Sequence, residues 1–501
     1  MDPDPGATAL ARETDPAGAR APAPAAPASA PGGPVEREIV LSLYEKRREI
    51  YPRARVGERL GRFQRWRWVM VWLTQIAFYG TPWLPWHGRQ AVLFDLAARK
   101  FYFFDLVLWP QDVIYLTGLL VVSALGLFLF TAVGGRLWCG YACPQTVYTE
   151  IFLWIERQIE GDRARRMALD RQAMSGSKFA RKAAKHGAWA AVGLWTGITF
   201  VGYFTPIGEL AGAALQASLG PWETFWILFY GFATYGNAGW LREQVCLYMC
   251  PYARFQSAMF DRDTLIVTYD QERGEPRGVG RKSRTRAEVG LGDCIDCGFC
   301  VQVCPTGIDI RRGLQYECIG CAACIDACDH VMRTNGLPIG LVRYTTSHAL
   351  AQHLGRAQIL RRVLRPRVLV YGAILGAVCA AMALALALRV PLKVDVIRDR
   401  GTFARELGDG AVENVYRLQI MNTSAAPATY RIRAEGLAGL AVASEDQIAV
   451  PATATQVVIL RLRAPAAGTP VRANRIELTV QSTGDPAVQV RERTVFFGLR
   501  P

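Results

Sequence analysis

Long apolar stretches alternate with strongly basic segments along this chain of 501 residues. A helix that spans a bilayer needs about 20 consecutive, mainly apolar residues. Five stretches approach that length: Trp68–Trp86, Val113–Val133, Gly187–Phe204, Trp222–Trp240 and Val368–Leu388. We therefore predict a multi-domain membrane protein whose α-helical transmembrane region has about five helices. Buried helices of a soluble core are the alternative interpretation.

The distribution of basic residues predicts an orientation for these helices. Arg and Lys are concentrated in Arg37–Arg67, Arg136–Lys185 and Arg242–Arg367, whereas residues 86–112 and 205–221 carry few or none. Because cytoplasmic loops carry an excess of Arg and Lys, we expect the three basic segments to be cytoplasmic and the C-terminal part to be periplasmic. The net charge of +15 is then explained by membrane topology, with membrane lipid and not nucleic acid as the partner.

The two ends of the chain have different compositions from the middle. Residues 1–35 are rich in Pro and Ala and predict a disordered cytoplasmic tail. From about Lys393, short stretches such as "VYRLQIMN" and "NRIELTVQS" alternate apolar and polar positions and are separated by turn residues. This pattern predicts an immunoglobulin-like (Ig-like) β-sandwich over residues 389–501. It has no cysteine and no catalytic constellation, so we expect it to contact other proteins.

Eight of the thirteen cysteines form two runs with the spacing C-x2-C-x2-C-x3-C. This spacing is typical of bacterial ferredoxins with two [4Fe–4S] clusters, in which the fourth cysteine of each run binds the other cluster. The predicted ligands of one cluster, the first cysteine set, are Cys294, Cys297, Cys300 and Cys328. Those of the other cluster, the second cysteine set, are Cys304, Cys318, Cys321 and Cys324. Two zinc sites are the alternative interpretation.

Four further cysteines occur in two CxxxCP motifs, each directly after an apolar stretch. These membrane-edge thiols are Cys139, Cys143, Cys246 and Cys250. We expect both pairs at cytoplasmic helix ends, with the two sulfurs of a pair on one helix face because residues i and i+4 are neighbours there. Thiolates favour soft ions such as Cu(I), so the four cysteines are a hypothetical copper site. Small packing residues are the alternative.

These features predict five regions along the chain. They are the tail (1–35), a membrane region with four helices and both CxxxCP motifs (36–260), a cytoplasmic 2[4Fe–4S] ferredoxin domain with connecting segments (261–367), the fifth membrane helix (368–388) and the periplasmic sandwich (389–501).

The chain closely resembles the FixG/CcoG family of cytochrome c oxidase accessory proteins from about Tyr44 to its end. The matching stretches include "RLWCGYACPQTVYTEIFLWIERQIEGDR", "REQVCLYMCPYARFQSAMFDRDTLIVTYD" and the ferredoxin segment "GDCIDCGFCVQVCPTGIDIRRGLQYECIGCAACIDACDHVM". The resemblance implies a role in assembling the cbb3-type oxidase by reducing Cu(II) to Cu(I). It also implies oxidase subunits or copper chaperones as partners.

Two other functions fit the same motifs. One is a quinol-linked electron carrier, in which Trp138, Tyr141 and Tyr148 lie near a quinone pocket beside the CxxxCP pairs. The other is a non-catalytic assembly scaffold that docks oxidase subunits through its external domain. Because the sequence has no flavin or nicotinamide fingerprint, the electron donor must be another protein or a quinol.

Overall fold

The computed structural model describes most of the chain beyond the N-terminal region. The described residues are 61–278, 286, 290–398, 404–408, 410–424, 426–466 and 469–498. The predicted disordered tail, residues 1–35, lies outside them.

Each of the five predicted apolar stretches contains a helix. These helices are α1 (Arg62–Gly80), α2 (Val113–Gly134), α6 (Gly176–Val201), α8 (Pro221–Tyr235) and α15 (Pro366–Ala387). In the described part of the chain, two helical segments are long and apolar enough to cross a membrane, Pro110–Gly134 and Pro366–Ala387. The first turns of α1 and α6 carry Arg and Lys, and α8 has only 15 residues, so these three helices remain predicted spans.

The first helix ends earlier than predicted. It stops at Gly80 and gives way to a 3-10 turn, Thr81–Trp83, because Pro82 cannot continue the α-helical hydrogen bonding. The segment that follows forms short strands. They are β1 (Pro85–Trp86), β2 (Arg89–Gln90), β3 (Val92–Asp95), β4 (Lys100–Phe103) and β5 (Leu106–Leu108).

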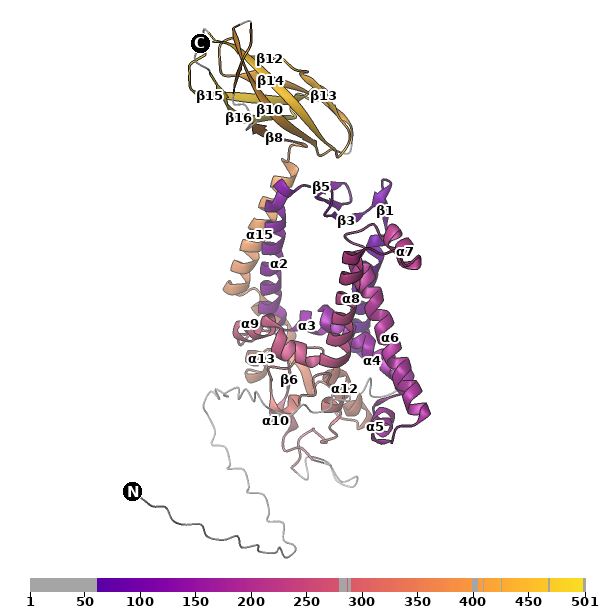
Figure 1. Ribbon diagram of the computed structural model, residues 1–501. Helices are drawn as coiled ribbons and strands as arrows, with labels where there is room; N and C mark the ends of the chain where they lie inside the picture. Colours follow the sequence, from indigo (N-terminus) through magenta and orange to yellow (C-terminus); the bar gives the residue numbers. More distant parts are fainter. Residues whose placement is uncertain are drawn as a thin grey trace, which may run out of the picture. The chain divides into compact units, whose positions relative to one another are not determined.

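The long helices pack in two pairs through small residues, α2 with α15 and α6 with α8 (Figure 1). A Cβ on Gly193 of α6 would lie 2.7 Å from the carbonyl oxygen of Gly231 in α8. A Cβ on Gly118 of α2 would lie 2.6 Å from the sulfur of Met382 in α15. The Gly193 contact is with backbone and leaves no room for a larger side chain, as is common where helices approach closely in membranes, whereas the flexible Met382 side chain could move away from a Cβ at Gly118.

Shorter elements connect the long helices to the ferredoxin region. Those before and between the long helices are α3 (Leu137–Tyr141), α4 (Pro144–Glu160), α5 (Arg163–Arg171), α7 (Ile207–Leu215), the π-helical turns Gly236–Leu241 and Val245–Met249, and α9 (Pro251–Met259). Those of the ferredoxin region are β6 (Ile266–Tyr269), α10 (Gln271–Gly274), α11 (Phe299–Gln302), a 3-10 turn (Ile310–Arg312), α12 (Ala323–Thr334), β7 (Val342–Thr345), α13 (Ser347–Ala351) and α14 (Arg356–Val363). Strands β6 and β7 pair antiparallel.

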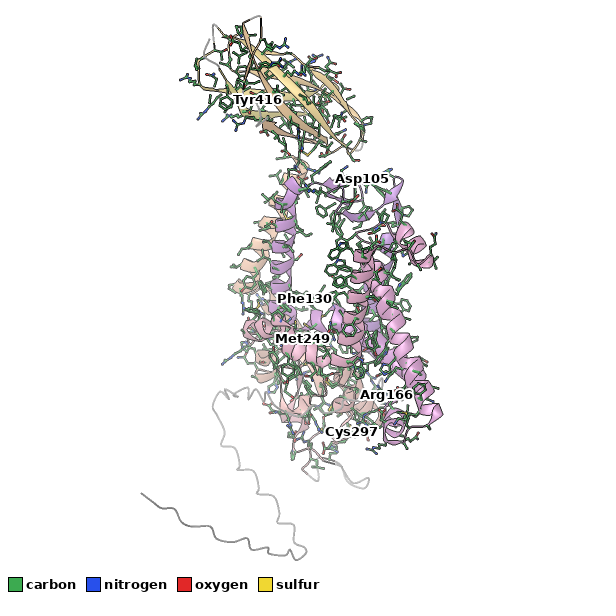
Figure 2. The ribbon with its side chains drawn as sticks, in the orientation of Figure 1. Asp105, Phe130, Arg166, Met249, Cys297 and Tyr416 are labelled. Carbon is green, nitrogen blue, oxygen red and sulfur yellow. The ribbon has the colours of Figure 1, made fainter. Side chains whose placement is uncertain are left out.

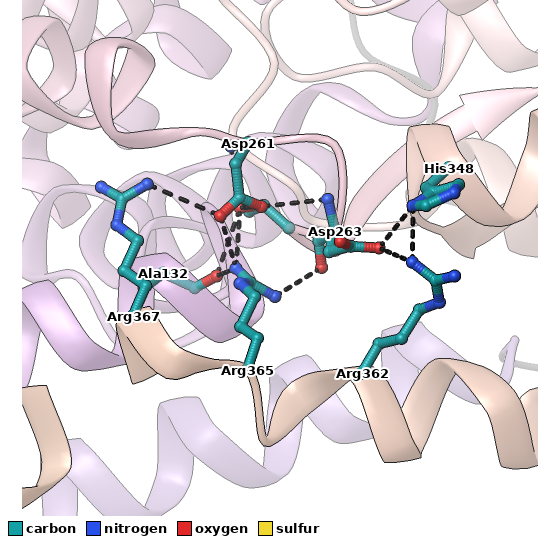
Figure 3. A network of polar contacts seen from close by, with 8 residues as sticks. Ala132, Asp261, Asp263, His348, Arg362, Arg365 and Arg367 are labelled. Atoms are coloured by element: carbon teal, nitrogen blue, oxygen red, sulfur yellow. Dashed lines mark hydrogen bonds and ion pairs between the residues drawn. The ribbon is translucent and has the colours of Figure 1, made fainter. Parts of the chain in front are cut away.

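A polar network joins the start of α15 to the end of α2 and to the segment before β6 (Figure 3). Arg365 donates to the carbonyl oxygen of Ala132 at 2.6 Å and forms an ion pair with Asp261 at 3.0 Å. Beside it, Asp263 lies 3.2 Å from the ring of His348 and 3.6 Å from Arg362. These contacts fix the ferredoxin region to the ends of the two helices that meet the membrane criterion.

The C-terminal domain is a sandwich of two antiparallel sheets, which confirms the predicted Ig-like fold. One sheet has the order β12–β14–β10–β8, with β9 on β10, and the other has the order β13–β11–β15–β16. Its strands are β8 (Leu392–Arg398), β9 (Arg405–Glu406), β10 (Ala411–Asn422), β11 (Ala428–Glu435), β12 (Ala441–Val442), β13 (Gln447–Val450), β14 (Thr455–Pro465), β15 (Ala473–Ser482) and β16 (Gln489–Phe497). Inward-facing residues such as Tyr416 and Phe496 form its core.

A buried ion-pair group lies where α2 begins and α15 ends. The side chain of Asp112 is 3% exposed, forms an ion pair with Arg389 at 2.8 Å, and also pairs with Lys393. Its carboxylate also accepts a hydrogen bond from the backbone N–H of Trp109. Because a buried carboxylate needs such partners, this group couples the end of α15 and the start of β8 to α2.

Candidate iron–sulfur and thiol sites

The first cysteine set lines one cavity. Three of its members lie in the loop before α11 and in that helix, and the fourth, Cys328, comes from α12. Gly298 has a φ of +68°, a left-handed conformation that suits glycine and lets the loop turn tightly between Cys297 and Cys300. Cys297, labelled in Figure 2, is exposed. Cys294 and Cys300 are buried.

The second cysteine set lines a second cavity. Cys304 follows α11, while the other three members lie in the loop before α12 and in that helix. Cys300 borders both cavities, so the two sites are neighbours. The structure thus places the remote fourth cysteine of each run at the other run's cavity, in the arrangement that crossed ligation requires. The assignment of individual ligands to each cluster remains a prediction.

The chemistry of both cavities fits iron–sulfur clusters. Four cysteines line the first cavity and five the second, because Cys300 borders both, and the rest of each lining is mostly apolar. Burial raises the pKa of Cys300, Cys318 and Cys328 to about 12, so these thiols need a positive partner to ionise. Cluster iron supplies that charge. Across the described residues, no group of three or more His, Cys, Asp or Glu side chains is arranged to hold a single metal ion.

The CxxxCP motifs do not form continuous helices, which corrects the expectation that each pair shares one helix face. Cys143 and Cys250 have extended backbone conformations and act as N-caps of α4 and α9. The reason is the proline after each of them, which disfavours helical geometry in the residue that precedes it. Their partners lie in separate short elements, Cys139 in α3 and Cys246 in a π-helical turn.

The tertiary structure nevertheless gathers all four membrane-edge thiols into one group. The charge of Cys246 would interact with those of Cys139, Cys143 and Cys250. Burial and these neighbours raise the pKa of Cys139 to about 11 and that of Cys246 to about 12. The four thiols do not make a formed single-ion site, because the described residues contain none. They are a group of half-buried thiols, and the copper site remains a hypothesis.

Helix α3 places this thiol group directly against the second cysteine set. Cys139 packs on the hydrophobic cluster that contains Ile319 and Cys321. A Cβ on Gly140 would lie 2.9 Å from the backbone N and Cα of Cys321. Since real Cβ contacts are longer than this, only glycine allows so close an approach at this position. Cys139 also contacts α9, the helix that begins at the proline of the second CxxxCP motif: the Oε1 of Gln256 lies 3.4 Å from the sulfur of Cys139.

Two arginines complete the second site, and the sequence analysis did not single them out. Arg67 of α1 is buried, lies 3.8 Å from Glu150, and interacts electrostatically with Cys321. Arg136 lies three residues before Cys139 and contacts the backbone of the second cysteine set. The closeness of Arg136 to the first CxxxCP motif in the sequence was a signal for its role. Arg67 is distant from the motifs in the sequence, so the sequence contained no such signal for it.

Comparisons with known protein families agree with this site. A family described as "4Fe-4S dicluster domain" matches residues 241–347, and one described as "4Fe-4S binding domain" matches residues 116–160. The C-terminal residues 382–499 match "IG-like fold at C-terminal of FixG". Together with the two apolar helices, these matches define a membrane-associated iron–sulfur protein of electron transfer, with a ferredoxin domain and an Ig-like domain.

Whole-chain relatives identify the family. The nitrogen fixation protein FixG of Rhizobium meliloti is 42% identical over 428 residues, which cover 79% of this chain and 80% of FixG. Proteins RdxA and RdxB of Cereibacter sphaeroides are each 39% identical, with 91% of this chain covered and 99% and 98% of the relatives. The chain belongs to the FixG family.

Proposed function

We propose that this protein reduces Cu(II) to Cu(I) during assembly of a cbb3-type cytochrome oxidase. In this proposal it resides in the bacterial inner membrane with five crossings, a cytoplasmic ferredoxin region and a periplasmic sandwich. Oxidase subunits or a copper chaperone receive the Cu(I). The supporting observation is the contact of Cys139, one of the four membrane-edge thiols, with the core around Cys321 of the second cysteine set.

The chain's own residues would contribute in three ways. The two cysteine sets hold the [4Fe–4S] clusters, which when bound accept and donate single electrons. Burial raises the pKa of Cys139 and Cys246, which favours their protonated thiols until a metal ion binds. Their soft sulfurs then prefer Cu(I) to Cu(II). For a one-electron couple, each tenfold preference raises the effective reduction potential of the copper by about 59 mV.

The reaction balances with one external electron per copper. A reduced electron-carrier protein or a quinol supplies that electron, and each Cu(II) becomes Cu(I). A quinol donor supplies two electrons to two Cu(II) ions and releases two protons, and each thiol that binds copper releases its own proton. Cys297, the exposed member of the first cysteine set, marks the part of that set that a protein donor could approach.

The test is anaerobic and uses the full-length protein in detergent. The clusters are reduced, excess reductant is removed, and Cu(II) is added while cluster absorbance and a Cu(I)-specific chelator are followed. We expect cluster reoxidation with matching Cu(I) formation, strongly slowed in a Cys139→Ser, Cys246→Ser double variant. Cys379→Ser is the matched control, because Cys379 is an exposed cysteine of α15 outside the motifs.

Three results would reject the copper proposal. Rapid reoxidation by a quinone, with none by Cu(II), would indicate the quinol-linked carrier. The structure does not itself group Tyr141 and Tyr148 at one pocket, because their hydroxyls contact different residues, Tyr344 and Tyr79 respectively. Lack of reaction with either oxidant would leave the assembly scaffold. Loss of iron in the double variant would assign the membrane-edge thiols to iron–sulfur binding, since the 4Fe-4S match over residues 116–160 includes Cys139.

A further inference from the structure

Arg136 connects three segments that are far apart in the sequence. Its Nη1 donates to the carbonyl oxygens of Tyr316 and Cys318, the latter at 3.3 Å, in the loop of the second cysteine set. Its Nη2 donates at 2.7 Å to the carbonyl oxygen of Ala253, in the helix that begins after the second CxxxCP motif. Arg136 itself precedes the first CxxxCP motif. One guanidinium therefore ties both thiol pairs to the second cysteine set.

The positive charge of Arg136 is buried and has no acidic partner. The residue is 7% exposed, and within the described part of the chain no carboxylate lies at ion-pair distance from it. Its hydrogen bonds to other segments end on backbone carbonyls, and the Tyr316 ring lies 4.9 Å from its guanidinium carbon. The positive charge of Arg136 interacts electrostatically with the thiols of Cys139, Cys246 and Cys318. A buried charge without a counterion acts strongly on its neighbours because little solvent screens it.

The first cysteine set has a different charge environment. Arg311 interacts with Cys300, but its charge is offset by Asp309, at 2.8 Å, and by Asp296. Arg286 donates to the carbonyl oxygen of Cys294 at 2.8 Å and is the corresponding backbone-bound arginine at this set. Each set thus has an arginine hydrogen-bonded to the backbone of a ligand. Substituting Arg286 is therefore a suitable comparison for substituting Arg136.

We propose that Arg136 is a positioning residue that holds the membrane-edge thiols on the second cysteine set and raises the reduction potential of the cluster bound there. A nearby positive charge favours the more negative, reduced cluster. The effect on potential stands whether or not copper is the substrate. The docking of the thiols as an electron acceptor site rests on the proposed function.

The experiment compares Arg136→Gln, Arg136→Lys and Arg286→Gln in the full-length protein. Iron content is measured first, then each cluster's midpoint potential is determined by redox titration with EPR detection. We expect Arg136→Gln to lower one midpoint and leave the other unchanged, and Arg286→Gln to lower the other one. Arg136→Lys keeps the positive charge, so its midpoints should stay near those of the parent. Because lysine has no planar fork to bridge the three carbonyls, this variant alters the docking without removing the charge.

The outcomes separate this inference from the proposed function. Unchanged midpoints in an iron-replete Arg136→Gln protein, or equal shifts of both clusters, would overturn the role in setting potential. If the Arg136→Gln protein loses iron, the Arg136→Lys protein is used in its place. A lowered midpoint in an Arg136→Lys protein with full iron content would also overturn the role of the Arg136 charge in setting the potential. Slower Cu(II) reduction in Arg136→Lys at normal midpoints supports docking, and an unchanged rate contradicts it. Shifted midpoints in a protein that never reduces copper would reject only the proposed function.

Discussion

Replacing Gly140 with alanine tests the contact between the thiol group and the second cysteine set. Gly140 lies in α3, and an added Cβ would sit 2.9 Å from the backbone N and Cα of Cys321. Backbone atoms cannot swing aside as a flexible side chain does. The cluster-binding loop and the CxxxCP segment must therefore separate by a few tenths of an ångström or more.

The expected magnitude follows from two opposing terms. An overpacked contact typically costs about 1–3 kcal/mol. Alanine in a helix is favoured over glycine by about 1 kcal/mol. Gly187→Ala in α6 is the matched control, since a Cβ there would meet nothing within 4 Å and only the favourable term applies. The difference between the two variants then isolates the clash, about 1–3 kcal/mol, and a difference of 1.4 kcal/mol corresponds to a factor of 10 in an equilibrium constant.

Thermal unfolding in detergent and iron retention under a chelator measure this difference. We expect Gly140→Ala to unfold at a lower temperature than Gly187→Ala and to lose iron faster. The rate of Cu(II) reduction by the prereduced protein should fall as well. Equal stability and equal iron retention of the two variants would show that α3 does not press on the cluster-binding loop, and would refute the reasoning.

The remaining predictions concern ligand pairing and the ion-pair group at the end of α15. Cys304→Ser should remove the same EPR signal as Cys318→Ser, and Cys328→Ser the same signal as Cys294→Ser; loss in Cys304→Ser of the signal that Cys294→Ser removes would contradict crossed ligation. Asp112→Asn leaves Arg389 and Lys393 without their buried partner and should destabilise the protein by about 3–5 kcal/mol, measured by thermal unfolding. An Asn variant as stable as the parent would show that this group adds no stability.

The sequence was sufficient where a residue's role depends on its near neighbours. The C-x2-C-x2-C-x3-C spacing predicted the ferredoxin domain, because short loops around a cluster are local structures. Alternation of apolar and polar residues predicted the sandwich for a similar reason, since side chains of a strand alternate between faces. Both predictions were confirmed by the structure and the family matches. The apolar stretches predicted helices, although Pro82 ended the first one early.

Only the tertiary structure decided what surrounds these motifs. The spacing in each CxxxCP motif suggested two sulfurs on one helix face, but the proline after Cys143 and Cys250 breaks the helix there. The chain instead brings the two pairs together from segments about a hundred residues apart and presses Gly140 on Cys321. The same packing brings Arg136 within hydrogen-bond distance of the carbonyl oxygen of Ala253. Contacts of this kind depend on how helices and loops pack in three dimensions, and local periodicity carries no information about them.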